Sequence, residues 1–214
     1  HQMKEWELAP TNAATMAKNQ ISFALTTADL KNKSDFFKNL RKAIEAGLSE
    51  KDALAALTTV PAKMIGMDGQ VGALKKGMTA NFIITSKNFS DKDNVLFENW
   101  VKGMRYKYAD MQMADIRGNY TLNGVGSKSL RLKISGEVLN PEAYIYEDTT
   151  AVRSGLNRQG TAFMLTVELK KAADKNGTYR LNGTMSGDHS LSGNGFQPNG
   201  EWMKWHGKNN NRQN

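Results

Sequence analysis

Few side chains in this sequence are of the kinds that bind metal ions or act as nucleophiles. Its 214 residues include three histidines, His1, His189 and His206, and no cysteine. The absence of cysteine excludes disulfides, thiolate zinc sites, iron–sulfur clusters and cysteine nucleophiles. No two histidines have the spacing that binds one metal locally, and neither a Gly-x-Ser-x-Gly motif nor a phosphate-binding loop occurs. Taken alone, the chain is poorly equipped for metal or nucleophile chemistry.

Asp29 is the carboxylate whose position suggests a site. It follows the apolar run of residues 21–25, which predicts a buried strand, and it precedes an amphipathic helix. In a (β/α)8 barrel, a residue just past the C-terminal end of a strand faces the active site. The alternative is that Asp29 is a loop residue that caps the next element, which is a common role for Asp.

Two further groups of residues offer weaker signals. Trp202 and Trp205 could form a platform on which a sugar stacks, but a spacing of three places them on opposite faces of a strand. We therefore expect at least one of them to pack in a core or an interface. Asp188 and His189 lie in a segment rich in glycine and serine, which predicts a surface loop rather than a site.

The charge pattern argues against a nucleic-acid partner, and the apolar pattern argues against a membrane-spanning helix. The formal net charge of +8 comes from 29 Lys+Arg and 21 Asp+Glu, spread thinly along the chain. A nucleic-acid-binding protein concentrates its basic residues on one face, so we expect no nucleic-acid partner. No apolar run approaches the roughly 20 residues that a membrane-spanning helix needs, and no signal peptide is visible in this piece.

Composition divides the chain into a helical part and a β-rich part. At about 100–200 residues per domain, its length fits one large or two small domains. Helices are predicted over residues 13–19, 35–46 and 50–57, with Ser34 and Ser49 as N-caps of the second and third. Pro61 ends the third helix or opens a short turn.

Strands are predicted from residue 81 onward. A short strand covers residues 81–85, and Lys102-Gly103 is predicted to form the turn of a hairpin. Beyond residue 109, apolar residues alternate with polar ones in short runs separated by Asn-Gly turns, which indicates an antiparallel sandwich or barrel. The alternating apolar residues are Tyr120/Leu122, Leu130/Leu132/Ile134, Tyr144/Tyr146, Phe163/Leu165/Val167/Leu169 and Tyr179/Leu181.

Three sequence blocks resemble a known family. They are residues 43–66 (AIEAGLSEKDALAALTTVPAKMIG), 69–85 (GQVGALKKGMTANFIIT) and 99–106 (NWVKGMRY). In order and spacing they resemble the C-terminal part of metal-dependent amidohydrolases, the imidazolonepropionase-like group in particular.

The resemblance implies an α+β chain in three parts. Residues 1–66 would be the last strand and helices of a (β/α)8 barrel, and residues 67–108 a segment of the family's small β-sandwich. Residues 109–214 would be an appended antiparallel β-domain, a sandwich or a barrel, like the extra domain of some large secreted bacterial relatives. We therefore expect a secreted or periplasmic protein.

The same resemblance assigns a role to Asp29 in the parent protein. Such enzymes hold a divalent metal, for which zinc is the expectation, and an Asp after the eighth strand serves as metal ligand and general base. The family pattern is Gly-Thr-Asp, whereas this chain has Leu25-Thr-Thr-Ala-Asp29, so Ala28 takes the Asp position in an ungapped comparison. Either the loop is one residue longer here or the ligand has been lost.

Two functions from different classes follow. The first is a C-terminal fragment of an amidohydrolase that cleaves carbon–nitrogen bonds, inactive and without a metal by itself. Its partners would be the remainder of the parent barrel, or a second copy bound through the exposed helices 35–46 and 50–57. The alternative is a non-catalytic β-rich module that binds carbohydrate or peptide or makes an inter-domain contact. Paired exposed aromatics beside Asn or Gln would favour carbohydrate, and a contiguous apolar patch would favour a domain interface.

Overall fold

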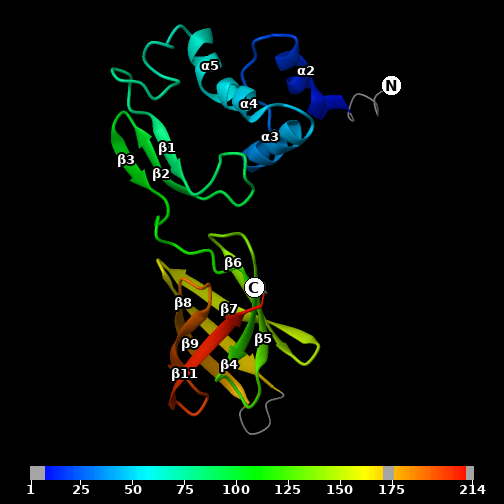
Figure 1. The fold of residues 1–214 in the computed structure, drawn as a ribbon, viewed down its shortest axis with the longest axis vertical. Coiled ribbons are helices and arrows are strands. Elements are labelled where there is room, and N and C mark those ends of the chain that lie inside the picture. The colour runs from blue at the N-terminus through cyan, green and yellow to red at the C-terminus, as the bar shows by residue number, and fades with distance from the viewer. Residues whose placement is uncertain (1–7, 171–175, 211–214) are drawn as a thin grey trace. The chain divides into compact units, whose positions relative to one another are not determined.

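The computed structural model describes residues 8–170 and 176–210, in two compact units, His1–Tyr108 and Ala109–Asn214 (Figure 1). The described part of the first unit contains four α-helices and two 3-10 turns, Ala9–Thr11 and Lys33–Asp35, and it ends with an antiparallel sheet of three strands in the order β1-β2-β3. The helices are α2 (Asn12–Lys18), α3 (Phe36–Glu45), α4 (Glu50–Leu57) and α5 (Thr59–Met64). The strands are β1 (Phe82–Thr85), β2 (Leu96–Val101) and β3 (Met104–Lys107). No helix among the described residues is long and apolar enough to cross a membrane.

The start of α4 follows the sequence prediction. The Ser49 hydroxyl accepts a hydrogen bond from the Asp52 backbone N–H at 3.0 Å and donates one to the Asp52 carboxylate at 2.6 Å. The first of these bonds satisfies one free backbone N–H group in the first turn of the helix, and the second holds the hydroxyl in place. Before α3, however, Asn32 caps a 3-10 turn (Lys33–Asp35), because its side-chain oxygen accepts from the Ser34 N–H at 3.2 Å. The N-cap of α3 itself is Asp35, which makes no capping hydrogen bond with its side chain. The prediction that Ser34 caps this helix is therefore wrong.

The predicted strand at residues 21–25 is also wrong. No strand in the described part of the chain pairs with this segment, and the Leu25 N–H donates to the Ala56 carbonyl in α4 at 3.0 Å instead. Phe23 and Leu25 pack against a small core around Leu40, Leu48 and Ala53. An apolar run becomes a strand only where a neighbouring strand supplies its ladder of hydrogen bonds.

The three-stranded sheet contains the predicted hairpin. Lys102 and Gly103 connect β2 to β3 with φ of 50° and 79°. Two positive φ angles in a two-residue turn match the right-handed twist of the flanking strands.

The second unit is a closed antiparallel barrel of eight strands. Each strand pairs with the next in sequence, and β11 closes the barrel by pairing with β4 (Figure 1). This settles the alternative between a sandwich and a barrel. The strands are β4 (Gly118–Asn123), β5 (Leu130–Gly136), β6 (Pro141–Glu147), β7 (Thr150–Gln159), β8 (Ala162–Leu169), β9 (Gly177–Met185), β10 (Leu191–Phe196) and β11 (Trp202–Asn209).

Side chains fill the barrel, as is usual for eight strands. The predicted inward residues of β4, β5, β8 and β9 are buried in one core together with Trp205, apart from Leu130, which is partly buried and packs against it. On β6 the prediction had the wrong face: Ala143 and Ile145 point inward, whereas Tyr144 and Tyr146 are half-buried on the outside. Tyrosine is amphipathic, so its spacing does not distinguish a core face from a surface face.

Candidate functional sites

Asp29 lies in an exposed turn. Its φ is +61°, the Leu30 N–H donates to the Thr27 carbonyl, and the Ala28 N–H donates to the Thr26 hydroxyl at 3.1 Å. The geometry is that of a turn residue in the left-handed region, which Asp tolerates better than most side chains.

The residues around Asp29 do not fit a zinc site by themselves. A catalytic zinc takes three protein ligands, and within residues 8–170 and 176–210 no three His, Cys, Asp or Glu side chains are grouped to hold a metal. His206 lies on β11 of the other unit, and His189 lies in the β9–β10 turn with φ of +62°. We therefore derive no chemical step through a metal on this chain.

The Asp188–His189 segment forms a turn between β9 and β10, in agreement with the predicted surface loop. The Asp188 carboxylate accepts from the Ser190 hydroxyl at 2.7 Å and from the Ser190 N–H at 3.0 Å. These hydrogen bonds from Ser190 lower the pKa of Asp188. The carboxylate therefore stabilises the turn and needs no ligand to explain it.

Arg158, near the end of β7, binds two loop segments at one end of the barrel. Its guanidinium donates to the Val138 carbonyl at 2.9 Å and to the Ala114 carbonyl at 2.6 Å. Burial lowers the pKa of Arg158, and the nearby Asp115 opposes that shift. These contacts tie the segment before β4 and the β5–β6 loop to β7, so they serve the fold.

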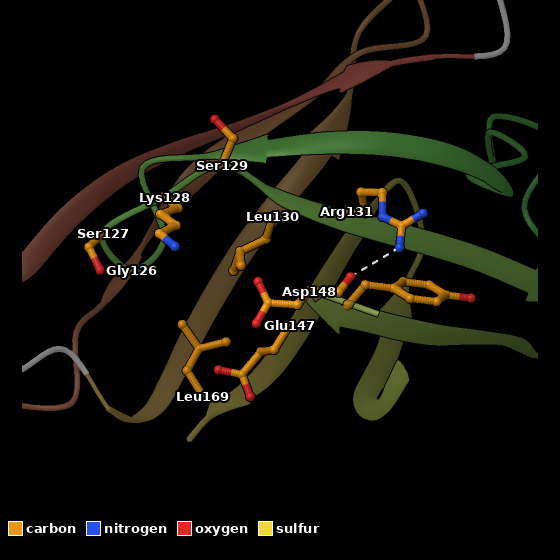
Figure 2. Close-up of a pocket in the computed structure, with 10 residues that line it drawn as sticks. Gly126, Ser127, Lys128, Ser129, Leu130, Arg131, Glu147, Asp148 and Leu169 are labelled. Atoms are coloured by element: carbon orange, nitrogen blue, oxygen red, sulfur yellow. Dashed lines mark hydrogen bonds between the residues drawn. The ribbon is translucent and has the colours of Figure 1, made fainter. Parts of the chain in front are cut away.

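The opposite end, which we call the mouth of the barrel, holds a pocket of about 310 Å³ (Figure 2). Its lining residues come from the β4–β5 loop, the start of β5, the end of β6 and the end of β8: Gly126, Ser127, Lys128, Ser129, Leu130, Arg131, Tyr146, Glu147, Asp148 and Leu169. Figure 2 shows the carboxylates of Glu147 and Asp148 turned toward the space beside Leu130 and Leu169.

Glu147 is buried at this mouth. Both of its carboxylate oxygens accept the Lys170 N–H, at 3.0 and 3.2 Å. Sequence reasoning missed this residue because it had placed Tyr144 and Tyr146 inside. The alternation of Ala143 and Ile145 was the available signal, since it carries Glu147 onto the inner face.

A second hollow, a shallow groove of about 540 Å³, lies on the outer surface over β10 and β11. It is lined by Asn123, Gly124, Ser192, Gly193, Asn194, Lys204, Trp205 and His206. Next to it, Phe196 and Trp202 lie directly opposite each other in the antiparallel register and are 48% and 56% exposed. Trp205 is 3% exposed, which confirms that at least one of the two tryptophans packs in the core.

Comparison with known proteins gives a family for the first unit. Residues 11–107 match the amidohydrolase family. The crystal structure of an amidohydrolase from Thermotoga maritima aligns with 46% of this chain at 22% identity and a TM-score of 0.44. This chain covers 26% of that protein's length. No curated protein sequence matches.

The residues that match this family model lie in the helical unit and its sheet, and the barrel lies beyond them.

Proposed function

We propose that this chain is the C-terminal part of a metal-dependent amidohydrolase of the imidazolonepropionase-like group. The complete protein would hydrolyse carbon–nitrogen bonds, and the barrel would be its appended domain. The observation that carries the proposal is the family match over residues 11–107, which contains the three sequence blocks in the family's order. The proposal includes a secreted or periplasmic location, for which a signal peptide upstream in the parent gene is the check.

The chain alone is expected to be inactive. Asp29 supplies one carboxylate, and the other ligands of the family's metal lie on barrel strands that precede this segment. The remainder of the parent barrel is the proposed partner. In support, one face of the three-stranded sheet carries Ile83, Val101, Met104 and Tyr106, each more than 40% exposed. A covering partner would stabilise such a face.

The proposal is tested with the 214-residue chain and with the parent protein. The purified chain should hold no stoichiometric zinc by mass spectrometry and should not hydrolyse amides. The parent should carry a His-x-His motif near its start and should show both properties. Zinc or turnover in the short chain would contradict the proposal, as would a parent that lacks the ligands.

Asp29→Asn in the parent then decides between the two interpretations of this loop. If the loop is one residue longer, the substitution abolishes activity and lowers the zinc content. If the ligand has been lost, zinc content is unchanged. Thr27→Ala, in the same turn, is the matched control.

A homo-oligomer through α3 and α4 is the competing way to cover the exposed apolar residues. Phe37 on α3 and Leu54 on α4 are 46% and 47% exposed. Sedimentation of the purified chain measures this directly, and Phe37→Ser with Leu54→Ser should return a dimer to monomer.

The second candidate function is that the barrel is a non-catalytic binding module. The observation that favours it is the pair of hollows on a closed scaffold, one at the mouth and one on the outside. A closed barrel presents such surfaces with little cost in ordering, since its backbone is already fully paired. Screening the full chain against glycan and small-molecule arrays tests this function apart from the first.

A further inference from the structure

We propose that the outer face of β9, β10 and β11 binds an oligosaccharide, with a preference for one that carries carboxylates. This inference rests on the proposed binding function of the barrel and names its site and its class of ligand.

The strand register gathers the relevant side chains into rows. Phe196 lies opposite Trp202 on one side and opposite Arg180 on the other. The next outward row is Asn182, Asn194 and Lys204. Opposed residues in a row are about 5 Å apart and successive rows about 7 Å, so aromatic, amide and cationic groups share one continuous patch.

The groove continues this patch with hydrogen-bonding groups. Ser192 lies opposite His206, and His206 lies opposite Asn123. All three line the groove together with Asn194 and Lys204. The patch therefore runs from an aromatic end to a polar end.

Buried Trp205 supports this patch from inside. Its indole N–H donates to the carbonyl oxygens of Asn182 and Asn194 at 3.0 and 3.3 Å. It thus links the backbones of β9 and β10 beneath the row of amides. A binding surface held by packed strands loses little freedom when a ligand docks.

The chemistry of the patch fits a sugar chain. The C–H face of a pyranose ring packs on an exposed aromatic ring, and its hydroxyls take hydrogen bonds from amide, hydroxyl and imidazole groups. An apolar partner protein would leave the amides and the ammonium unpaired, which is costly.

The charged residues of the patch favour an acidic sugar over a neutral one. In the rows described above, the charged residues are Arg180 and Lys204, both cationic. The Lys204 ammonium lies over the Trp202 ring, 5.8 Å from the ring centre. Its flexible stem lets it move aside and pair with a carboxylate of a sugar that stacks on that ring. A uronic acid supplies both the ring face and the carboxylate. The mouth pocket, by contrast, carries both signs of charge, with Lys128 and Arg131 beside Glu147 and Asp148.

Calorimetric titration of the full chain with two probes tests the inference: an oligogalacturonate and a neutral cello-oligosaccharide. The oligogalacturonate should bind more tightly, and salt should weaken it. Trp202→Ala should weaken both by at least tenfold. Lys204→Gln should weaken the acidic sugar severalfold and leave the neutral one nearly unchanged.

Matched variants keep the outcome clear. Tyr106→Ala removes an exposed aromatic outside the barrel, and Glu147→Gln alters the mouth, so neither should change sugar binding. Trp202→Phe keeps a ring, should retain most of the affinity, and guards against misfolding of the alanine variant.

Three results would overturn the inference. One is no binding of either sugar. Another is binding that Glu147→Gln abolishes, which places the ligand at the mouth and leaves the binding function of the barrel standing. The third is tight, Trp202-dependent binding of a single-stranded oligonucleotide in place of the sugars.

Discussion

The indole of Trp205 on β11 occupies the space that Gly183 leaves open on β9, across the intervening strand β10. A Cβ atom placed on Gly183 would lie 2.4 Å from Cζ2 of Trp205. The ring also packs edge-on against Phe163, with ring centroids 6.0 Å apart. A side chain at position 183 must therefore push the largest ring of the core aside.

Gly183→Ala should destabilise the barrel by about 1–3 kcal/mol, since a methyl group is forced into a filled core. Urea unfolding of the full chain, followed by tryptophan fluorescence, measures the change. Gly187→Ala is the matched control, because no atom lies within 4 Å of a Cβ there. An equal effect of the two substitutions would contradict the role assigned to Gly183.

The cap of α4 gives a prediction for the first unit. Ser49→Ala removes both hydrogen bonds with Asp52 and should cost about 1 kcal/mol. Ser34→Ala should change stability by less than about 0.5 kcal/mol, because only the backbone N–H of Ser34 takes part in the preceding cap. Thermal unfolding of the two variants compares them, and the reverse order would restore Ser34 as a cap.

The elements that could be predicted from the sequence are those whose signal is local. The Ser49 cap and the Lys102-Gly103 turn act over two to four residues, and the alternation on β8 depends on one strand's own burial. The segment of residues 21–25 shows the limit: it is irregular backbone, and Phe23 and Leu25 pack against the core of the helices instead of pairing in a sheet. Sequence spacing does not show which neighbour is present.

Strand β10 was missed for a related reason. Its glycines serve contacts with another strand: a Cβ on Gly193 would lie only 1.9 Å from the Asn182 carbonyl oxygen. From sequence alone such glycines indicate a loop. Without β10 the register of Phe196 against Trp202 cannot be derived, so the aromatic end of the outer patch appears only in the structure.

A buried carboxylate supports the three-stranded sheet. Glu98 on β2 is 3% exposed, accepts from the Trp100 indole N–H at 2.8 Å and pairs with the Arg105 guanidinium at 2.8 Å. Arg105→Ala leaves this charge short of a partner and should destabilise the sheet by about 1–3 kcal/mol. The guanidinium is half exposed, so water screens part of its effect.

Hydrogen exchange of the β2 and β3 backbone amides in the full chain measures this loss. Arg105→Lys should recover part of the protection, since lysine keeps the positive charge but lacks the planar guanidinium group. Lys76→Ala, at an exposed position in the loop before β1, is the control and should leave these amides unchanged. Unchanged protection in Arg105→Ala would show that the ion pair does not stabilise the sheet.

Tyr120 links barrel stability to alkaline pH. Its ring is fully buried, and its hydroxyl donates to the Ile116 carbonyl at 2.8 Å. Burial, aided by the nearby carboxylate of Asp115, raises the pKa of Tyr120 to about 12. In the unfolded chain the phenol ionises near its ordinary pKa of 10.0. Between these values the folded barrel keeps a proton that the unfolded chain releases, so ionisation favours unfolding.

The contribution of Tyr120 to stability should therefore be complete below about pH 10 and should be lost as the pH rises through about 12. Urea unfolding of the full chain across this range, compared with Tyr120→Phe, measures it. The Phe variant loses the hydrogen bond to Ile116, about 1 kcal/mol, and should start less stable. Its stability should then fall less steeply above pH 10, because it has no phenol at position 120 to ionise on unfolding. Other tyrosines, such as Tyr144, titrate in both proteins, so their effects cancel in the difference. Parallel curves for the two proteins would show that Tyr120 ionises equally easily in the folded and unfolded states.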